Sequence, residues 1–137
     1  MQQAASNKTS SAKKQTITKF TDLKAWQEGH KLVVATYSIV KSFPPEEQFG
    51  LSSQMRRCAV SITSNVAEGF SRPTRPDKIH FFSMAKGSLT ELQNQLLVAR
   101  DVGYIDSDAF SSQAEQSITV HKLLTGLVKS LHQEKRS

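Results

Sequence analysis

The chain has 137 residues, of which 37% are hydrophobic and 22% charged, and its formal net charge at pH 7 is +6. This length suits a single domain with its own core, and the composition excludes a wholly disordered chain. One cysteine cannot form an internal disulfide, and no run approaches the roughly 18 consecutive apolar residues of a membrane span. A cytoplasmic protein without a membrane segment is therefore expected.

The net positive charge is concentrated at the start of the chain. The first 19 residues contain four lysines and no acidic residue, which leaves the remainder at about +2. Residues 1–18 are poor in large apolar side chains, so we predict a disordered basic arm. The arm could be merely solubilising, or it could contact phosphates through Lys13 and Lys14, together with Lys19 directly after it.

A first helix is predicted after Thr21 or Asp22, either of which can cap it. Phe43-Pro44-Pro45 ends it, because proline lacks a backbone donor. His30 lies within the apolar line and is interpreted as a hydrogen-bonded core histidine, since no second metal ligand is spaced to join it. The apolar line repeats at helical spacing and consists of Leu23, Trp26, His30, Val33, Tyr37 and Val40.

The second helix is predicted from Leu51 to Gly69, with Ser52 or Ser53 as its cap. It carries an apolar line beside a polar one of small and charged side chains. The apolar line consists of Leu51, Met55, Cys58, Ile62, Val66 and Gly69. The polar line consists of Gln54, Arg57, Ser61, Ser64, Asn65 and Glu68.

The third helix has the same design, which predicts that it packs against the second. It is expected to begin at Asp77 or Lys78 and to end near Val102. Gly87 costs stability inside a helix, which predicts close approach by another helix there. The apolar positions are Phe82, Ala85, Leu89, Leu92, Leu96 and Ala99, and the polar ones include Ser88, Glu91 and Gln95.

Gly103-Tyr104-Ile105 closes the third helix, and Asp106 or Ser107 can cap a fourth. The fourth helix is predicted to present an apolar line as well. That line consists of Phe110, Ala114, Ser117, His121, Leu124, Val128 and Leu131. The polar residues 133–137 are expected to fray.

Short connections between the four helices predict an all-α, antiparallel up-down-up-down four-helix bundle over residues 19–132. This topology gathers basic side chains at one end and acidic ones at the other. The basic end would contain the arm, Arg72, Arg75, Lys78, Lys129, Lys135 and Arg136, and the acidic end Glu46, Glu47, Asp101, Asp106 and Asp108. The apolar lines of the first and fourth helices are too wide for two neighbours, which indicates an oligomer.

No residues are arranged for catalysis or for a cofactor, and a metal site is not expected either. There is no G-x-S-x-G, P-loop or H-E-x-x-H sequence, and Cys58 lies in an apolar line where an inert buried thiol is expected. The polar line has two interpretations. Arg57 and Glu91 could bind a ligand, or they could form an ion pair within a subunit or between subunits, which we favour.

The segments GLSSQMRRCAVSITSNVAEGFSR and FFSMAKGSLTELQNQLLVARDVGYI resemble the bacterial four-helix-bundle family named for proteins encoded in 23S rRNA intervening sequences. The resemblance covers about residues 20 to 130. This chain departs from the family pattern at Thr63, where relatives commonly have proline. The kink expected in the second helix of those relatives should therefore be milder here. The resemblance implies a bundle that assembles into a ring, typically a pentamer. A similar bundle, the accessory variability determinant protein of retroelements, binds nucleic acid alongside a reverse transcriptase.

Two functions remain after these exclusions. The first is a non-enzymatic oligomeric scaffold that binds RNA or DNA through a basic rim as an accessory factor, with a protein such as a reverse transcriptase as a further partner. The second is a protein-protein adaptor ring in which the charge serves only solubility. A salt titration would separate them, because releasing counterions from nucleic acid makes affinity fall steeply with salt.

Overall fold

The computed structural model describes residues 16–134, so Lys13, Lys14, Lys135, Arg136 and most of the predicted arm lie outside it. In the described range the secondary structure is entirely helical, which confirms the all-α prediction. Four α-helices are formed: α2 (Lys24–Val40), α3 (Leu51–Ser71), α4 (Arg75–Asp101) and α5 (Ser107–Glu134). Two short 3-10 helices, η1 (Phe20–Asp22) and η2 (Pro45–Glu47), precede α2 and α3.

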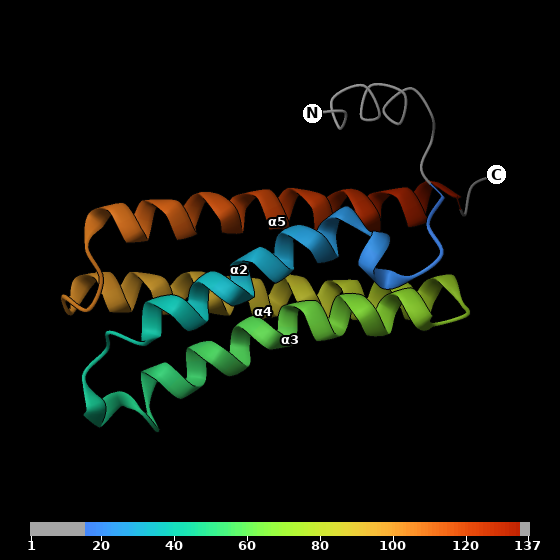
Figure 1. The fold of residues 1–137 in the computed structure, drawn as a ribbon. Helices are drawn as coiled ribbons and strands as arrows, with labels where there is room; N and C mark the ends of the chain where they lie inside the picture. Colours follow the sequence, from blue (N-terminus) through green and yellow to red (C-terminus); the bar gives the residue numbers. More distant parts are fainter. Residues whose placement is uncertain (1–15, 135–137) are drawn as a thin grey trace, which may run out of the picture.

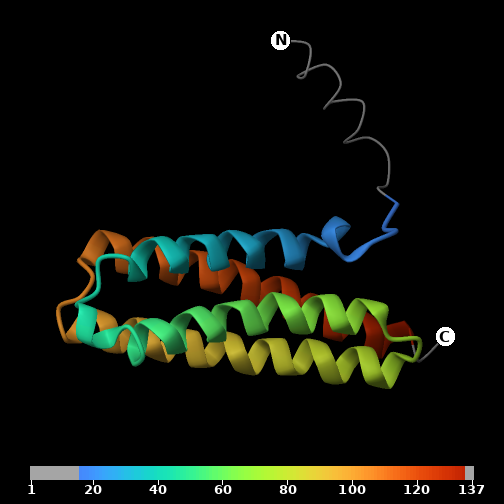
Figure 2. The ribbon, with the colours of Figure 1, turned by 60° about the horizontal axis from the view of Figure 1, so that its bottom comes forward.

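The four α-helices lie side by side, and the loops between consecutive helices lie at alternate ends of the bundle (Figures 1 and 2). Each helix has two neighbours: α2 and α4 both pack against α3 and α5. The α3–α4 loop and the end of α5 share one end, whereas the α2–α3 and α4–α5 loops share the other (Figure 1). The predicted packing of the second helix on the third is thus confirmed as the α3–α4 contact.

The core faces of α3 and α4 are those predicted. In α3, Met55, Cys58, Ile62, Val66 and Gly69 are all buried. In α4, every position of the predicted apolar line is buried, and Leu89 and Leu92 are fully so. These two faces are continuous stripes of apolar side chains at helical spacing, which can be buried only together.

The predicted core faces of α2 and α5 are partly wrong. His30 is exposed and stacks on Trp26, with 4.7 Å between ring centroids, and His121 is exposed on α5. The structure instead buries small and polar residues between the larger ones. In α2 these are Ala25, Glu28, Gly29 and Thr36, and in α5 it is Gln113, while Ser117 of the predicted line is buried as expected.

Hydrogen bonds between α2 and α5 explain this rotation of the faces. Gln113 Nε2 donates to Thr36 Oγ1 over 3.1 Å, and Gln116 Nε2 donates to the Glu28 backbone oxygen over 2.8 Å and to its Oε1 over 3.0 Å. Hydrogen bonds from Gln116 and then Lys31 lower the pKa of the Glu28 carboxyl. Buried polar groups are stable only when bonded in this way, and a scan for apolar periodicity passes over them.

The helix caps differ from the predicted ones at the first two helices. Asp22 accepts from the backbone N–H groups of Thr18 and Lys19 and so caps η1, while α2 begins only after Leu23. At α3, Glu47 Oε1 accepts from the Leu51 N–H over 3.0 Å, in place of either predicted serine. A side chain from the preceding turn therefore replaces the usual local cap.

The other two helices use conventional caps. Thr74 Oγ1 accepts from the Asp77 N–H over 3.3 Å, so α4 begins at Arg75, earlier than predicted. Asp106 caps α5 by accepting from the Ala109 N–H over 2.8 Å, as one of the two alternatives proposed. The helix then continues to Glu134, so the first part of the expected frayed tail is helical.

The close approach predicted at Gly87 is not found. Gly87 is exposed, and a Cβ added there would meet nothing within 4 Å in the described part of the chain. Close contacts lie instead at Gly69, where a Cβ would come within 2.7 Å of Phe82 Cε1, and at Gly29, where a Cβ would come within 3.1 Å of Thr63 Cγ2. Glycine at position 29 therefore lets α2 approach α3, which is continuous from Leu51 to Ser71.

A hydrogen bond joins the two loops at the end of the bundle away from the α3–α4 loop. Tyr104 OH donates to Glu47 Oε2 over 2.7 Å, and the Tyr104 ring lies 5.1 Å from that of Phe43. The Leu51 N–H and then Tyr104 lower the pKa of Glu47 below its ordinary value of 4.5. Stability from this ionised carboxylate is therefore present above pH 4.5 and is lost as the pH falls through the lowered pKa.

Tyr104→Phe is expected to reduce stability most at neutral pH, with the difference from the unmodified protein shrinking below pH 4.5 as Glu47 becomes protonated. Urea unfolding across an acidic pH series measures that difference. A difference that stays constant with pH would show that the lost contact is not with an ionised carboxylate.

Candidate functional site

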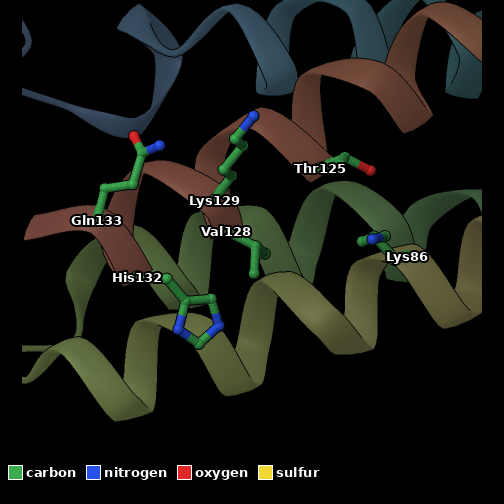
Figure 3. A pocket seen from close by; sticks show the side chains of 6 residues that line it. All are labelled: Lys86, Thr125, Val128, Lys129, His132 and Gln133. Carbon is green, nitrogen blue, oxygen red and sulfur yellow. The ribbon is translucent and has the colours of Figure 1, made fainter. Parts of the chain in front are cut away.

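A groove between α4 and α5 gathers basic side chains near the end of α5 (Figure 3). Its volume is about 430 Å³. Val128 and His132 point toward α4, whereas Lys129 and Gln133 extend away from it (Figure 3). We call this the basic groove; it is lined by Lys86 of α4 and by Thr125, Val128, Lys129, His132 and Gln133 of α5.

A second hollow of about 280 Å³ continues from the basic groove toward the start of α4. It is lined by Arg75, Pro76, Ile79 and His132, so His132 borders both spaces. Arg75 Nε lies 3.9 Å from Glu134 Oε1, which partly offsets its charge. Three permanent cations, Arg75, Lys86 and Lys129, thus lie along one face of the α4–α5 pair.

Lys78 was predicted to be a free phosphate contact, but the structure gives it an internal role. Its Nζ donates to the Phe70 backbone oxygen over 2.7 Å and lies 3.4 Å from that of Gly69. It therefore caps the C-terminal end of α3, where carbonyl groups lack helical partners. Substituting Lys78 would affect stability as well as charge, so it is unsuitable for testing phosphate binding.

Arg72 is also engaged within the chain. Its Nη2 lies 2.6 Å from Glu68 Oε2, and its guanidinium carbon lies 4.7 Å from the centre of the Phe81 ring. Of the other predicted contacts, Lys19 is exposed before η1, and Lys129 is exposed in the basic groove. The structure therefore shifts the candidate site from the α3–α4 loop to the facing sides of α4 and α5.

Lys86 and His132 are the groove residues that the sequence analysis missed. Lys86 follows Arg75 by eleven residues, which is close to three helical turns and places both on one face of α4. His132 follows Lys129 by three residues on α5. A search for basic side chains at helical spacing would have found each set, but not that α4 and α5 bring them together.

The predicted separation of charge along the bundle is weaker than expected. Glu68, Asp77 and Glu134 add negative charge to the basic end. At the other end, Arg100 pairs with Asp101 over 2.9 Å and lies over the Phe110 ring. Within residues 16–134 the separation of charge between the two ends is therefore reduced, and the cations of the basic groove form a local cluster.

The predicted polar line forms a second groove, between α3 and α4. Its volume is about 260 Å³. Ser61 and Ser88 bond to each other over 2.8 Å, Cys58 Sγ donates to the Ser88 backbone oxygen over 3.0 Å, and Asn65 Nδ2 donates to the Ser61 backbone oxygen over 2.9 Å. We call it the polar groove; it is lined by Gln54, Arg57, Cys58, Ser61, Ser88, Glu91 and Gln95.

The favoured ion pair between Arg57 and Glu91 is not formed within this chain. Both residues are exposed, and no salt bridge joins them in the described structure. Of the remaining predicted positions, Ser64 is exposed on α3, and Glu68 bonds to Arg72 and not to the groove. The pairing of Arg57 and Glu91 across subunits stays a prediction.

Cys58 is unsuited to nucleophilic chemistry. Burial and the nearby Glu91 carboxylate raise the pKa of its thiol to about 12. Since only the thiolate reacts, about 10⁻⁴ of the thiol would be reactive at pH 8. Iodoacetamide is therefore expected to label Cys58 very slowly in the folded protein and rapidly after unfolding in guanidinium chloride, as mass spectrometry would show. Equal rates in the two states would contradict this assignment.

A third, apolar groove of about 170 Å³ lies between α4 and α5 nearer the α4–α5 loop. Leu97 and Ile118 on its walls are 42% and 49% exposed. We call it the apolar groove; it is lined by Gln93, Leu96, Leu97, Phe110, Ala114, Ser117 and Ile118.

Two further features are absent from residues 16–134. None of the helices there has the length and apolar character needed to cross a membrane. The same residues contain no group of three or more His, Cys, Asp or Glu side chains placed to hold a metal ion.

Comparison with known proteins places this fold in a family. No protein with curated annotation matches the chain. A similar crystal structure is that of a protein of unknown function from the S23 ribosomal protein family of Bacteroides thetaiotaomicron, with 24% identity and a TM-score of 0.71, covering 77% of this chain and 95% of that one. The family model described as 23S rRNA-intervening sequence protein matches residues 21–126. The chain therefore belongs to the 23S rRNA-intervening sequence protein family.

Proposed function

We propose that this protein is a non-enzymatic scaffold that binds RNA or DNA through phosphate groups in the basic groove. The observation that carries the proposal is the placement of Lys86 and Lys129 on facing helices, with Arg75 in the adjoining hollow. No acidic side chain lines the basic groove in the described structure. Lysine and arginine neutralise phosphates without reading the base sequence, so affinity should vary little between sequences.

The proposed binding unit is an antiparallel bundle assembled into a ring, for which a pentamer is the expected state. The apolar groove supports assembly, because Leu97 and Ile118 leave apolar surface in contact with water. A ring would repeat the basic groove around its circumference, and several weak contacts on one strand would then act together. In this proposal the assembly acts in the cytoplasm as an accessory factor.

A salt titration tests the proposal. Fluorescence anisotropy would measure the affinity of the full chain for unrelated RNA and DNA strands of equal length. We expect similar affinities for all sequences and a linear fall of log K with log salt, with a slope of about −0.9 for each phosphate contacted in duplex DNA. Absence of binding at about 50 mM salt would reject the proposal, because screening is weak under that condition.

A protein-protein adaptor is the second candidate, and the exposed apolar groove favours it. In that case Leu97, Phe110 and Ile118 would seat a segment of another polypeptide such as a reverse transcriptase. Binding to such a partner would depend little on salt, and Ile118→Asp would abolish it. The same substitution would leave salt-dependent nucleic-acid binding by each subunit in place.

A further inference from the structure

The floor of the polar groove is a closed set of hydrogen bonds. Ser61 and Ser88 bond to each other, and Asn65 Nδ2 also lies 3.2 Å from Ser61 Oγ. Cys58 donates its thiol proton to the Ser88 backbone oxygen. These groups therefore satisfy one another through hydrogen bonds within the groove.

Gln95 is the unsatisfied group. Gln95 is only 6% exposed, and its side-chain Oε1 is buried without a hydrogen-bond partner in the described structure. Buried acceptors almost always have a donor, and leaving one unpaired costs free energy. Gln95 lines the polar groove, so a rotation of its side-chain amide would turn the unpaired oxygen toward a donor that enters the groove.

Arg57 and Glu91 supply one charge of each sign to the groove. Ser61 of α3 meets Ser88 of α4, and α4 runs back along α3 from their common loop (Figure 2). Arg57 lies one turn before Ser61, and Glu91 lies nearly one turn after Ser88, so the two are at about the same height. They stand on opposite helices, and each is exposed without an ion pair to the other.

We propose that the polar groove binds a free α-amino acid. The ligand carboxylate accepts from the Arg57 guanidinium, whose fork of donors suits a carboxylate. The ligand ammonium donates to the Glu91 carboxylate and to Gln95 Oε1, and its three N–H groups are enough for both. The proposal is independent of nucleic-acid binding, because it uses α3 and the opposite side of α4 from the basic groove.

The lining of the groove disfavours other ligand classes. Glu91 opposes a phosphate or another simple anion, and Arg57 opposes a simple cation. No aromatic ring lines the groove, so a nucleobase would lack a stacking surface there. No aliphatic side chain is among the residues that line the groove, so we expect several amino acids to bind with similar affinity.

Isothermal titration calorimetry of the full chain with a panel of standard L-amino acids tests the proposal. The amino acid that binds best would then be compared with its N-acetyl derivative, which lacks the ammonium, and its amide, which lacks the carboxylate. We expect saturable binding of the free amino acid and at least about tenfold weaker binding of either derivative, because each loses a charge-assisted hydrogen bond.

Matched variants separate a ligand site from a structural role. Arg57→Gln and Glu91→Gln should each weaken amino-acid binding by at least about tenfold, whereas Arg56→Gln, on the same helix outside the groove, should not change it. Gln95→Met removes the unpaired oxygen at similar volume. It should weaken binding while leaving the urea midpoint unchanged or higher, because an orphan buried acceptor is lost.

Three results would overturn the proposal. The first is the absence of saturable binding by any amino acid in the panel. The second is equal binding of the free amino acid and its two derivatives. The third concerns the mass of the assembly, measured by light scattering. If Arg57→Gln or Glu91→Gln changes this mass and added amino acids do not, the two residues pair between copies of the chain. The Lys86→Gln, Lys129→Gln variant should keep amino-acid binding, which distinguishes failure here from failure of the nucleic-acid proposal.

Discussion

Phe82→Ala is expected to lower the free energy of unfolding by about 3–5 kcal/mol. The Phe82 side chain is 3% exposed at the α3–α4 contact, and a Cβ added at Gly69 would come within 2.7 Å of its Cε1. The ring therefore fills the space that Gly69 leaves open. Truncation removes apolar contacts and leaves a cavity that the flanking helices can close only in part.

Urea unfolding followed by circular dichroism measures this loss. Phe49→Ala is the matched control, because the same truncation occurs at a side chain that is 89% exposed. Its effect should stay within about 0.5 kcal/mol. Similar losses for the two variants would mean that the ring of Phe82 is not part of the core.

Replacing Lys86 and Lys129 together with glutamine is expected to weaken nucleic-acid binding by about 100-fold at 0.1 M salt. Each phosphate contact contributes about 0.9 to the slope of log K against log salt, which corresponds to nearly tenfold in affinity at that concentration. The slope for duplex DNA should fall by about 1.8. No side-chain hydrogen bond or ion pair within the described chain depends on either ammonium group, so the fold should be retained.

The control for this variant removes the same charge elsewhere. Lys41→Gln with Arg56→Gln changes two cations outside the basic groove, and its effect should be limited to the weak influence of net charge. Thermal unfolding would verify that both proteins fold. If the two double variants lose affinity equally, the binding is a general response to charge, and the basic groove is not the site.

Sequence reasoning was most successful where one physical requirement dominated. In α3 and α4, apolar residues recur without interruption, so only one face of each helix can be buried, and the structure buries that face. Proline and glycine likewise placed the loops near their observed positions, because they restrict or free the backbone locally. These signals depend on neighbouring residues along the chain.

The residues of the candidate sites could be predicted from the sequence only in part. Lys129 was predicted, but Lys86 joins it only because α5 packs against α4. Lys78 and Arg72 looked like free cations, and their roles at the end of α3 depend on where the α3–α4 loop places them. A sequence shows that a side chain is charged, whereas its available partners depend on residues distant in the chain.

The sequence by itself determined the helical class, the approximate extent of the four helices and the core faces of α3 and α4. The tertiary structure decided which face of α2 and α5 is buried, because Thr36 and Gln113 satisfy each other across 77 positions of sequence. It also decided that helices meet closely at Gly29 and not at Gly87. Local periodicity indicates only which face of a helix is apolar on average. Whether a polar side chain or a glycine is buried depends on which residues of another helix pack against it.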